Sequence, residues 1–114
     1  MSRPPPLTEI QKQRLSALEP ALKEAVYAAD YARAKQFAAD IQSVLRATGH
    51  ETRLMQSKNW LFEAALNAGE LLTAEAGFRG VRAKTVRSTR VHLEATALLG
   101  KLCTTRREVA FEAK

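Results

Sequence analysis

The chain has 114 residues, a hydrophobic fraction of 46% and a formal net charge of +6 at neutral pH. This length suits one domain, and such a hydrophobic fraction excludes a chain that is disordered throughout. Glycine and proline are scarce, at 5 and 4 residues, whereas helix-favouring residues such as alanine, leucine, glutamate and lysine dominate. We therefore predict an all-α protein.

The distribution of apolar residues predicts neither a membrane span nor a secretory signal. The uncharged run at residues 95–100 is far shorter than the roughly 18 apolar residues that a membrane span needs. The N-terminus carries Arg3, but no apolar segment follows it as a signal peptide would require. We expect a cytoplasmic protein without a membrane partner.

The sequence contains no recognisable catalytic or metal-binding motif. Its single cysteine, Cys103, and its two isolated histidines do not have the spacing of metal ligands. Cys103 lies on the apolar side of its predicted helix, so we expect a buried structural thiol rather than a nucleophile. Trp60 is assigned to the core rather than to a binding site. The expectation is a protein that is not an enzyme and needs no cofactor.

The first third of the chain predicts a disordered start and then a helix. Residues 1–7 are proline-rich and are expected to be disordered. Thr8 and Gln11 have the spacing of a capping box, which predicts that a helix begins at about Thr8. Pro20 interrupts the apolar stripe, and the pattern leaves open one kinked helix or two short helices ending near Ala29.

The rest of the chain has the apolar periodicity of four further helices. We predict them at residues 31–47, 52–68, 70–83 and 90–105. Gly49 and Gly69 are expected to end two of them, because glycine adopts the left-handed conformation of a helix terminus without strain. These helices form a single helical-repeat domain over residues 8–105, and residues 106–114 form a C-terminal tail or a short capping helix.

An internal repeat connects the two halves of this domain. Residues 29–34 align with residues 69–74: each segment has a small residue, an acid, a large apolar residue and, three places later, an alanine. The separation of the two segments, measured from Asp30 to Glu70, equals the length of two helices and their connections. Two such helices are the repeating unit of a helical-hairpin solenoid. We expect Ala34 and Ala74 to lie where two antiparallel helices cross closely.

On these residues the chain resembles the tetratricopeptide-repeat (TPR) family. The second helix of that repeat carries alanine and, four residues later, an aromatic residue, as at Ala74 and Phe78. Its first helix carries a Leu-Gly pair, as at Leu99 and Gly100. The resemblance implies antiparallel helical hairpins stacked as a short solenoid of about five helices. A plain irregular helical bundle is the alternative.

The resemblance also implies a docking surface lined by the first helix of each hairpin. The residues that it places there are Glu19, Lys23, Gln56, Asn59, Glu63, Asn67, Glu94 and Lys101. Amides and acids at helical spacing can form hydrogen bonds with the backbone of a peptide ligand. The alternative is that they form the solvent-facing side of amphipathic helices.

A second candidate site is a run of basic residues that no acid interrupts. It consists of Arg79, Arg82, Lys84, Arg87 and Arg90. Positive charge and neighbouring hydroxyls suit phosphate groups, so this run is a candidate polyanion-binding segment. A solvated basic loop without a partner is the alternative.

Taken together, these features favour a non-enzymatic protein-protein interaction module that acts as an adaptor or as a subunit of a larger assembly. The alternative is a basic helical protein that binds nucleic-acid backbone within a nucleoprotein complex. The third hairpin lacks its second helix, which would leave Leu98, Leu99 and Leu102 partly uncovered. We therefore expect the chain to bind another protein or to form a homo-oligomer.

Overall fold

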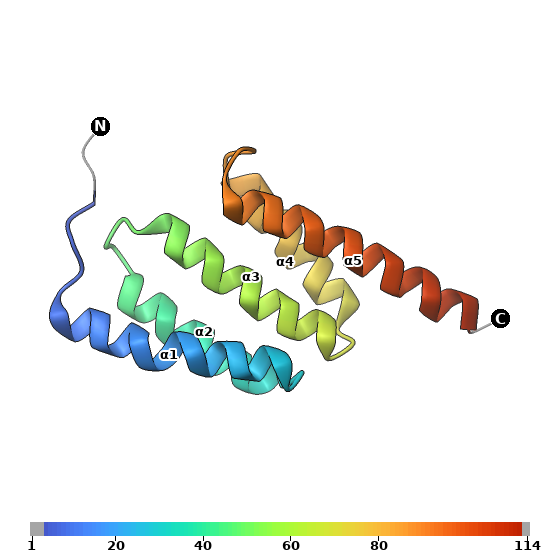
Figure 1. Cartoon of the computed structure of the whole chain (residues 1–114), viewed down its shortest axis with the longest axis horizontal. Helices are drawn as coiled ribbons and strands as arrows, with labels where there is room; N and C mark the ends of the chain where they lie inside the picture. The colour runs from blue at the N-terminus through green and yellow to red at the C-terminus, as the bar shows by residue number, and fades with distance from the viewer. Residues whose placement is uncertain (1–3, 113–114) are drawn as a thin grey trace.

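The computed structural model describes residues 4–112, and the side chains of residues 4–108 (Figure 1). Within this range the chain forms five helices and no strand, which confirms the all-α prediction. The helices are α1 (Glu9–Tyr27), α2 (Tyr31–Leu45), α3 (Glu51–Asn67), α4 (Leu71–Lys84) and α5 (Arg90–Glu112).

Helix α1 is one continuous helix, which decides between the two possibilities left open by Pro20. It begins with the predicted capping box: the backbone N–H of Gln11 donates to the Thr8 hydroxyl at 3.2 Å, and that of Thr8 donates to the Gln11 side chain at 2.8 Å. Leu15 and Leu22, on either side of Pro20, are fully buried. Packing of this apolar stripe offsets the hydrogen bond that proline removes.

The link after α1 and the link after α3 have the same backbone geometry. They are separated along the chain by the same number of residues as the two segments of the sequence repeat. Asp30 N–H donates to the Ala25 carbonyl at 2.9 Å, and Glu70 N–H donates to the Ala65 carbonyl at 2.8 Å. Each link is a Schellman motif, in which the residue after the helix cap has a positive φ. That residue is Ala29 (φ 55°) in the first link and Gly69 (φ 86°) in the second. The sequence repeat is therefore also a repeat of backbone conformation.

The N-terminal segment lies against the turn between α2 and α3. The Nε2 atom of His50 donates to the Pro5 carbonyl at 2.8 Å, and a Cβ on Gly49 would lie 3.0 Å from the Cβ of Pro4. Leu7 is buried in the core formed with α1 and α2. We expected disorder over residues 1–7; residues 4–7 have these contacts, and residues 1–3 lie outside the described residues.

Helix α3 is the centre of the molecule and contacts each of the other four helices. Helices α1, α3 and α5 lie side by side in one layer, and α2 and α4 lie behind them (Figure 1). Helices α2 and α4 both pack on α3 but do not contact each other. The molecule is elongated, with a radius of gyration of 15.1 Å against about 13 Å for a compact domain of this length.

The core consists of three groups of buried side chains, divided by α3. One lies between α1, α2 and α3, a second between α3, α4 and α5, and a smaller third at the start of α5. Ala34 and Ala74 are fully buried in the first and second groups, as expected for residues at close helix crossings. Phe78 is the largest fully buried side chain.

Helix α5 differs from the prediction in length and in what it exposes. It continues to Glu112, so residues 106–112 extend α5 instead of forming a separate tail or cap, and residues 113–114 lie outside the described range. Leu98 and Leu102 are 9% and 1% exposed, because they pack against α3 and α4. The expectation that they are uncovered is wrong, and only Leu99 is half-buried.

The prediction of a buried thiol at Cys103 is also wrong, because the residue is exposed. Leu102, one position earlier, faces the core, and a helix turns by about 100° per residue. Cys103 therefore points away from α3.

Candidate functional site

The amides that we predict on a docking surface connect neighbouring helices. Asn59 is 0% exposed, and its Nδ2 atom donates to the Val91 carbonyl of α5 at 3.1 Å. Asn67 donates to the Val26 carbonyl of α1 at 3.0 Å. Gln56 donates to the Glu94 carboxylate of α5 at 3.2 Å. The prediction of Asn59 as a ligand contact is wrong, because packing of α5 on α3 covers it.

Two charged residues of the same surface, Glu19 and Lys23, contact neighbouring side chains of α3. Arg53 donates from Nε and Nη2 to the two carboxylate oxygens of Glu19, at 3.1 and 2.7 Å, which joins α3 to α1. This hydrogen-bonded pair raises the pKa of Arg53. The Nζ atom of Lys23 lies 4.7 Å from the centre of the Trp60 ring, which is half-buried at the edge of the core.

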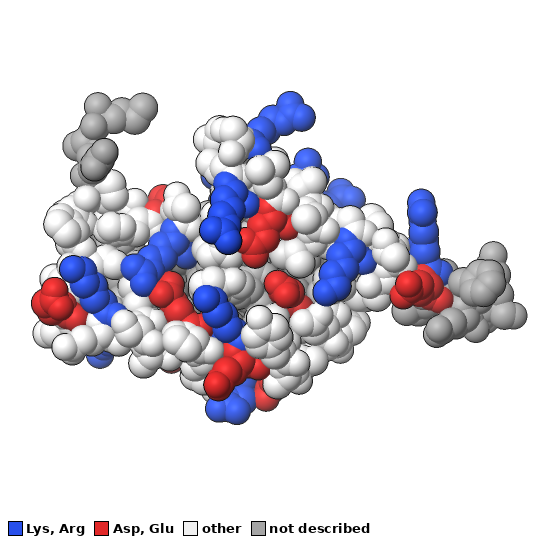
Figure 2. Space-filling model, in the orientation of Figure 1, with Lys and Arg blue, Asp and Glu red and all other residues white. Residues whose placement is uncertain are grey.

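Glu63 on this face is close enough to Lys101 and Glu94 of α5 for their charges to affect it. Partial burial raises the pKa of Glu63, Lys101 acts in the opposite direction, and the Glu94 carboxylate raises it further. Figure 2 shows that acidic and basic side chains alternate across the face formed by α1, α3 and α5. This face therefore has no large patch of a single charge.

The predicted polyanion-binding segment is divided between different parts of the surface. Arg79 and Arg82 lie beside Gly100 and Cys103 of α5, and Arg79 is paired with Glu75 at 3.0 Å. The same Glu75 accepts a hydrogen bond from Arg106 at 2.6 Å, so this part of the cluster is partly neutralised.

The other members of the segment lie elsewhere. Lys84 borders a groove between α2 and α4, Arg87 is exposed in the turn before α5, and Arg90 lies beside His50 near the start of α3. The five residues are all exposed, but they line different hollows or lie in the turn that follows α4. The structure does not bring the five charges onto one surface.

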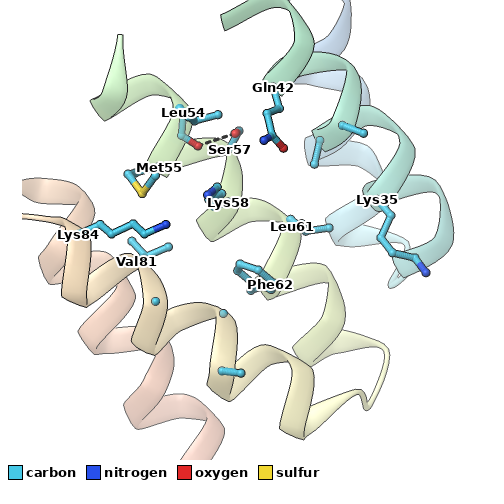
Figure 3. Close-up of a pocket in the computed structure, with 15 residues that line it drawn as sticks. Lys35, Gln42, Leu54, Met55, Ser57, Lys58, Leu61, Phe62, Val81 and Lys84 are labelled. Atoms are coloured by element: carbon cyan, nitrogen blue, oxygen red, sulfur yellow. Dashed lines mark hydrogen bonds between the residues drawn. The ribbon is translucent and has the colours of Figure 1, made fainter. Parts of the chain in front are cut away.

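A groove of about 510 Å³ lies between α2 and α4, with α3 as its floor (Figure 3). We call it the α2–α4 groove. Its floor is mainly apolar and consists of Leu54, Met55, Ser57, Lys58, Leu61 and Phe62. The hydroxyl of Ser57 donates to the Leu54 carbonyl at 2.6 Å, so this polar group is already satisfied within α3.

The walls of the α2–α4 groove are open because their residues are small. The α2 wall contains Ala38 and Ala39, and the α4 wall contains Ala76, Gly77 and Gly80. A Cβ on Gly80 would meet no atom within 4 Å, so the space beside it is empty. A Cβ on Gly77 would overlap the ring of Phe62, so the space beside it is filled.

Lysines border the α2–α4 groove, one from each of its three helices. They are Lys35 of α2, Lys58 of α3 and Lys84 of α4. Figure 3 shows Lys84 reaching over the groove towards α3, whereas Lys35 extends from the outer edge of α2. No acidic residue lines the groove among the described residues. The groove thus combines an apolar floor, small walls and positive charge.

This groove was not predicted from the sequence, although one signal for it was present. Gly77 and Gly80 lie one turn apart inside α4, which continues through both to Lys84. Glycine inside a helix costs about 0.5–1 kcal/mol relative to alanine, so two such residues one turn apart require a reason in the packing. That reason is the Phe62 ring at Gly77 and the open wall at Gly80.

Comparison of the chain with protein-family models, with curated proteins and with solved structures finds no match in any of the three. No helix in the described part of the chain combines the length and apolar character needed to cross a membrane. Among the described residues, no three His, Cys, Asp or Glu side chains are grouped so that they could share a metal ion. We take the α2–α4 groove as the candidate site because it combines an apolar floor, small walls and three lysines.

Proposed function

We propose that this chain is a non-enzymatic protein-interaction module, an adaptor or a subunit of a larger assembly, and that it binds a helical segment of its partner in the α2–α4 groove. Helices α2 and α4 both rest on α3 without contacting each other. A helix laid between them would contact all three. This unfilled position in the second layer is the observation that carries the proposal.

The small wall residues and the apolar floor of the groove support a helix as its occupant. Packed helices approach to about 8–10 Å between axes, and small residues at the contact allow the shorter distances. The alanines of α2 and the open wall at Gly80 are such residues. The apolar floor, which includes Leu54 and Leu61, provides the surface whose burial stabilises the complex.

Stacking of hairpins in the manner of TPR proteins is part of the same proposal. The two equivalent Schellman links and the packing of α1, α3 and α5 in one layer support it. In that arrangement α5 is the first helix of a third hairpin. Leu98 and Leu102 of α5 are covered by α3 and α4 without a sixth helix.

The alternative of nucleic-acid binding has weaker support. A phosphate-binding surface needs its positive charges on one face of the protein, where they can follow the backbone of the ligand. Here Arg79 shares Glu75 with Arg106, and Lys84 and Arg90 border different hollows. The charges that suggested the alternative are therefore dispersed.

Site-specific photo-crosslinking in cells of the source organism tests the proposal. A photoreactive residue at Gly80 lies in the groove, whereas the same residue at Ala97, which is exposed on α5, is the control. We expect Gly80 to give one discrete adduct whose linked peptide, identified by mass spectrometry, belongs to a helical segment, and Ala97 to give none. An identical adduct from both positions, or none from Gly80, contradicts the proposal.

A further inference from the structure

We infer that the α2–α4 groove recognises an acidic amphipathic helix, one with a stripe of small and apolar residues flanked by carboxylates. This inference rests on the proposed function and adds the chemical character of the partner. The positive charge of the groove is the observation that supports this inference. Lys35, Lys58 and Lys84 border the groove, and no acidic residue lines it among the described residues.

The ion pairs of the described residues all lie outside the groove. On the face of α1, α3 and α5, Arg53 pairs with Glu19, and on α4 and α5 Glu75 pairs with two arginines. None of the three groove lysines forms an ion pair within the described residues, and the Nζ atom of Lys35 lies 5.0 Å from the centre of the Tyr31 ring. Positive charge beside an apolar surface is thus left uncompensated at this place, and a carboxylate on the occupant would compensate it.

The positions of the lysines describe the occupant further. In Figure 3, Lys84 and Lys35 lie towards opposite ends of the groove, and Lys58 lies between them. Helix α4, which forms one wall, has 14 residues and is about 21 Å long at about 1.5 Å per residue. The occupant therefore carries carboxylates along its whole length rather than at one end only.

An extended peptide suits this groove less well than a helix. All three sides of the groove are helices, whose backbone groups are already paired, and the Ser57 hydroxyl is satisfied by Leu54. An extended chain would leave its own buried N–H and C=O groups without partners, whereas a helix pairs these groups internally. Nucleic acid is also disfavoured, because its phosphates would lie over the apolar floor.

The test uses the full-length chain labelled with ¹⁵N and two synthetic helical peptides, each slightly longer than α4. Both peptides carry the same Ala/Leu stripe; one has glutamates on its flanks and the other has lysines. We expect the acidic peptide to shift the backbone amide signals of Gly77 and Gly80 saturably. The basic peptide should bind at least about tenfold more weakly, as expected from three charge contacts that are open to solvent. Added salt should reduce the difference.

A charge-reversal variant and a matched control complete the experiment. Lys35→Glu, Lys58→Glu and Lys84→Glu together should reverse the preference between the peptides. The control, Lys12→Glu, Lys101→Glu and Arg107→Glu, changes the net charge equally on exposed positions of α1 and α5 and should leave the preference unchanged. Circular dichroism shows whether both variants keep the helical fold.

The outcomes separate this inference from the proposed function. If both peptides bind equally, or the reversal variant retains the preference, the groove accepts a helix but the acidic partner is wrong. If neither peptide shifts the Gly77 and Gly80 signals, both proposals fall. If a short DNA duplex shifts these signals more strongly than the acidic peptide does, the groove is a nucleic-acid site and the inference is overturned.

Discussion

Two glycines on one helix have opposite roles, which are set by what lies beside each. A methyl group at Gly77 would enter the space of the Phe62 ring, which packs edge-on against Phe78 with 6.2 Å between ring centres. At Gly80 a methyl group would enter empty space.

Alanine at these two positions should therefore have opposite effects on stability. We expect Gly77→Ala to lower the free energy of unfolding by about 1–3 kcal/mol through overpacking. Gly80→Ala should raise it by about 0.5–1 kcal/mol, because alanine loses less conformational entropy on folding. Urea denaturation of the two variants measures both changes. Changes of the same sign would contradict the assigned surroundings of the two residues.

The two Schellman links provide a second matched pair. Gly69 and Ala29 occupy equivalent positions with positive φ, where a Cβ is strained. Gly69→Ala should destabilise the protein by about 1 kcal/mol, and Ala29→Gly should stabilise it by about 0.5 kcal/mol after the greater freedom of glycine in the unfolded chain is counted. Thermal unfolding tests this, and a loss of stability in both variants would be inconsistent with a shared geometry.

Glu63 makes stability depend on pH. Burial raises its folded-state pKa above the unfolded value near 4.5, so the folded state favours the protonated form. The stability that Glu63 contributes is fully present below its unfolded-state pKa and is lost as the pH rises through its folded-state pKa. We expect Glu63→Gln to be more stable than the parent protein at neutral pH and not in acid. Denaturation across this pH range, with the exposed Glu9→Gln as control, checks the sign.

At the scale of elements, asparagine side chains connect neighbouring helices. Asn59 joins α3 to α5 and is fully buried, with its Oδ1 atom unpaired in the described structure. Asn67 joins α3 to α1 from an exposed position. A buried polar contact that loses one partner costs more than one open to water.

The two contacts should therefore differ in their effect on stability. Asn59→Ala should lower the free energy of unfolding by about 1–3 kcal/mol, through the lost hydrogen bond and the cavity. Asn67→Ala should cost about 0.5–1 kcal/mol. Urea denaturation distinguishes the two. A larger effect at Asn67 would mean that α5 is not fastened to α3 through Asn59.

For the whole molecule, the burial of Leu98 and Leu102 weakens the reason to expect self-association through α5, on which Leu99 is half-buried and Leu93 is 58% exposed. The expectation relied on uncovered leucines, but Leu98 and Leu102 are buried within the chain. We expect the isolated protein to be a monomer with a mass near 12.6 kDa in light scattering at micromolar concentration. A stable dimer would show that another surface mediates assembly, and disruption of that dimer by Gly80→Trp would place it in the α2–α4 groove.

Short-range patterns were sufficient to predict the all-helical fold and the ends of most of its helices. The capping box of Thr8 and Gln11, the glycine at position 69 and the internal repeat all depend on residues close in sequence or on simple periodicity. Their physical causes, backbone hydrogen bonds at helix ends and burial of one helical face, act within a single helix or hairpin. The ends of α2, α3 and α4 accordingly lie within two residues of the predicted positions.

Only the tertiary structure decided where the surface features lie. Asn59 and Cys103 exchanged their expected environments, because the rotation of α3 and α5 about their axes depends on how these helices pack together. The division of the basic segment likewise depends on where α4 ends. The α2–α4 groove arises because two helices, separated by α3 in sequence, do not contact each other. Such a gap depends on the complete arrangement of side chains, which no local pattern records.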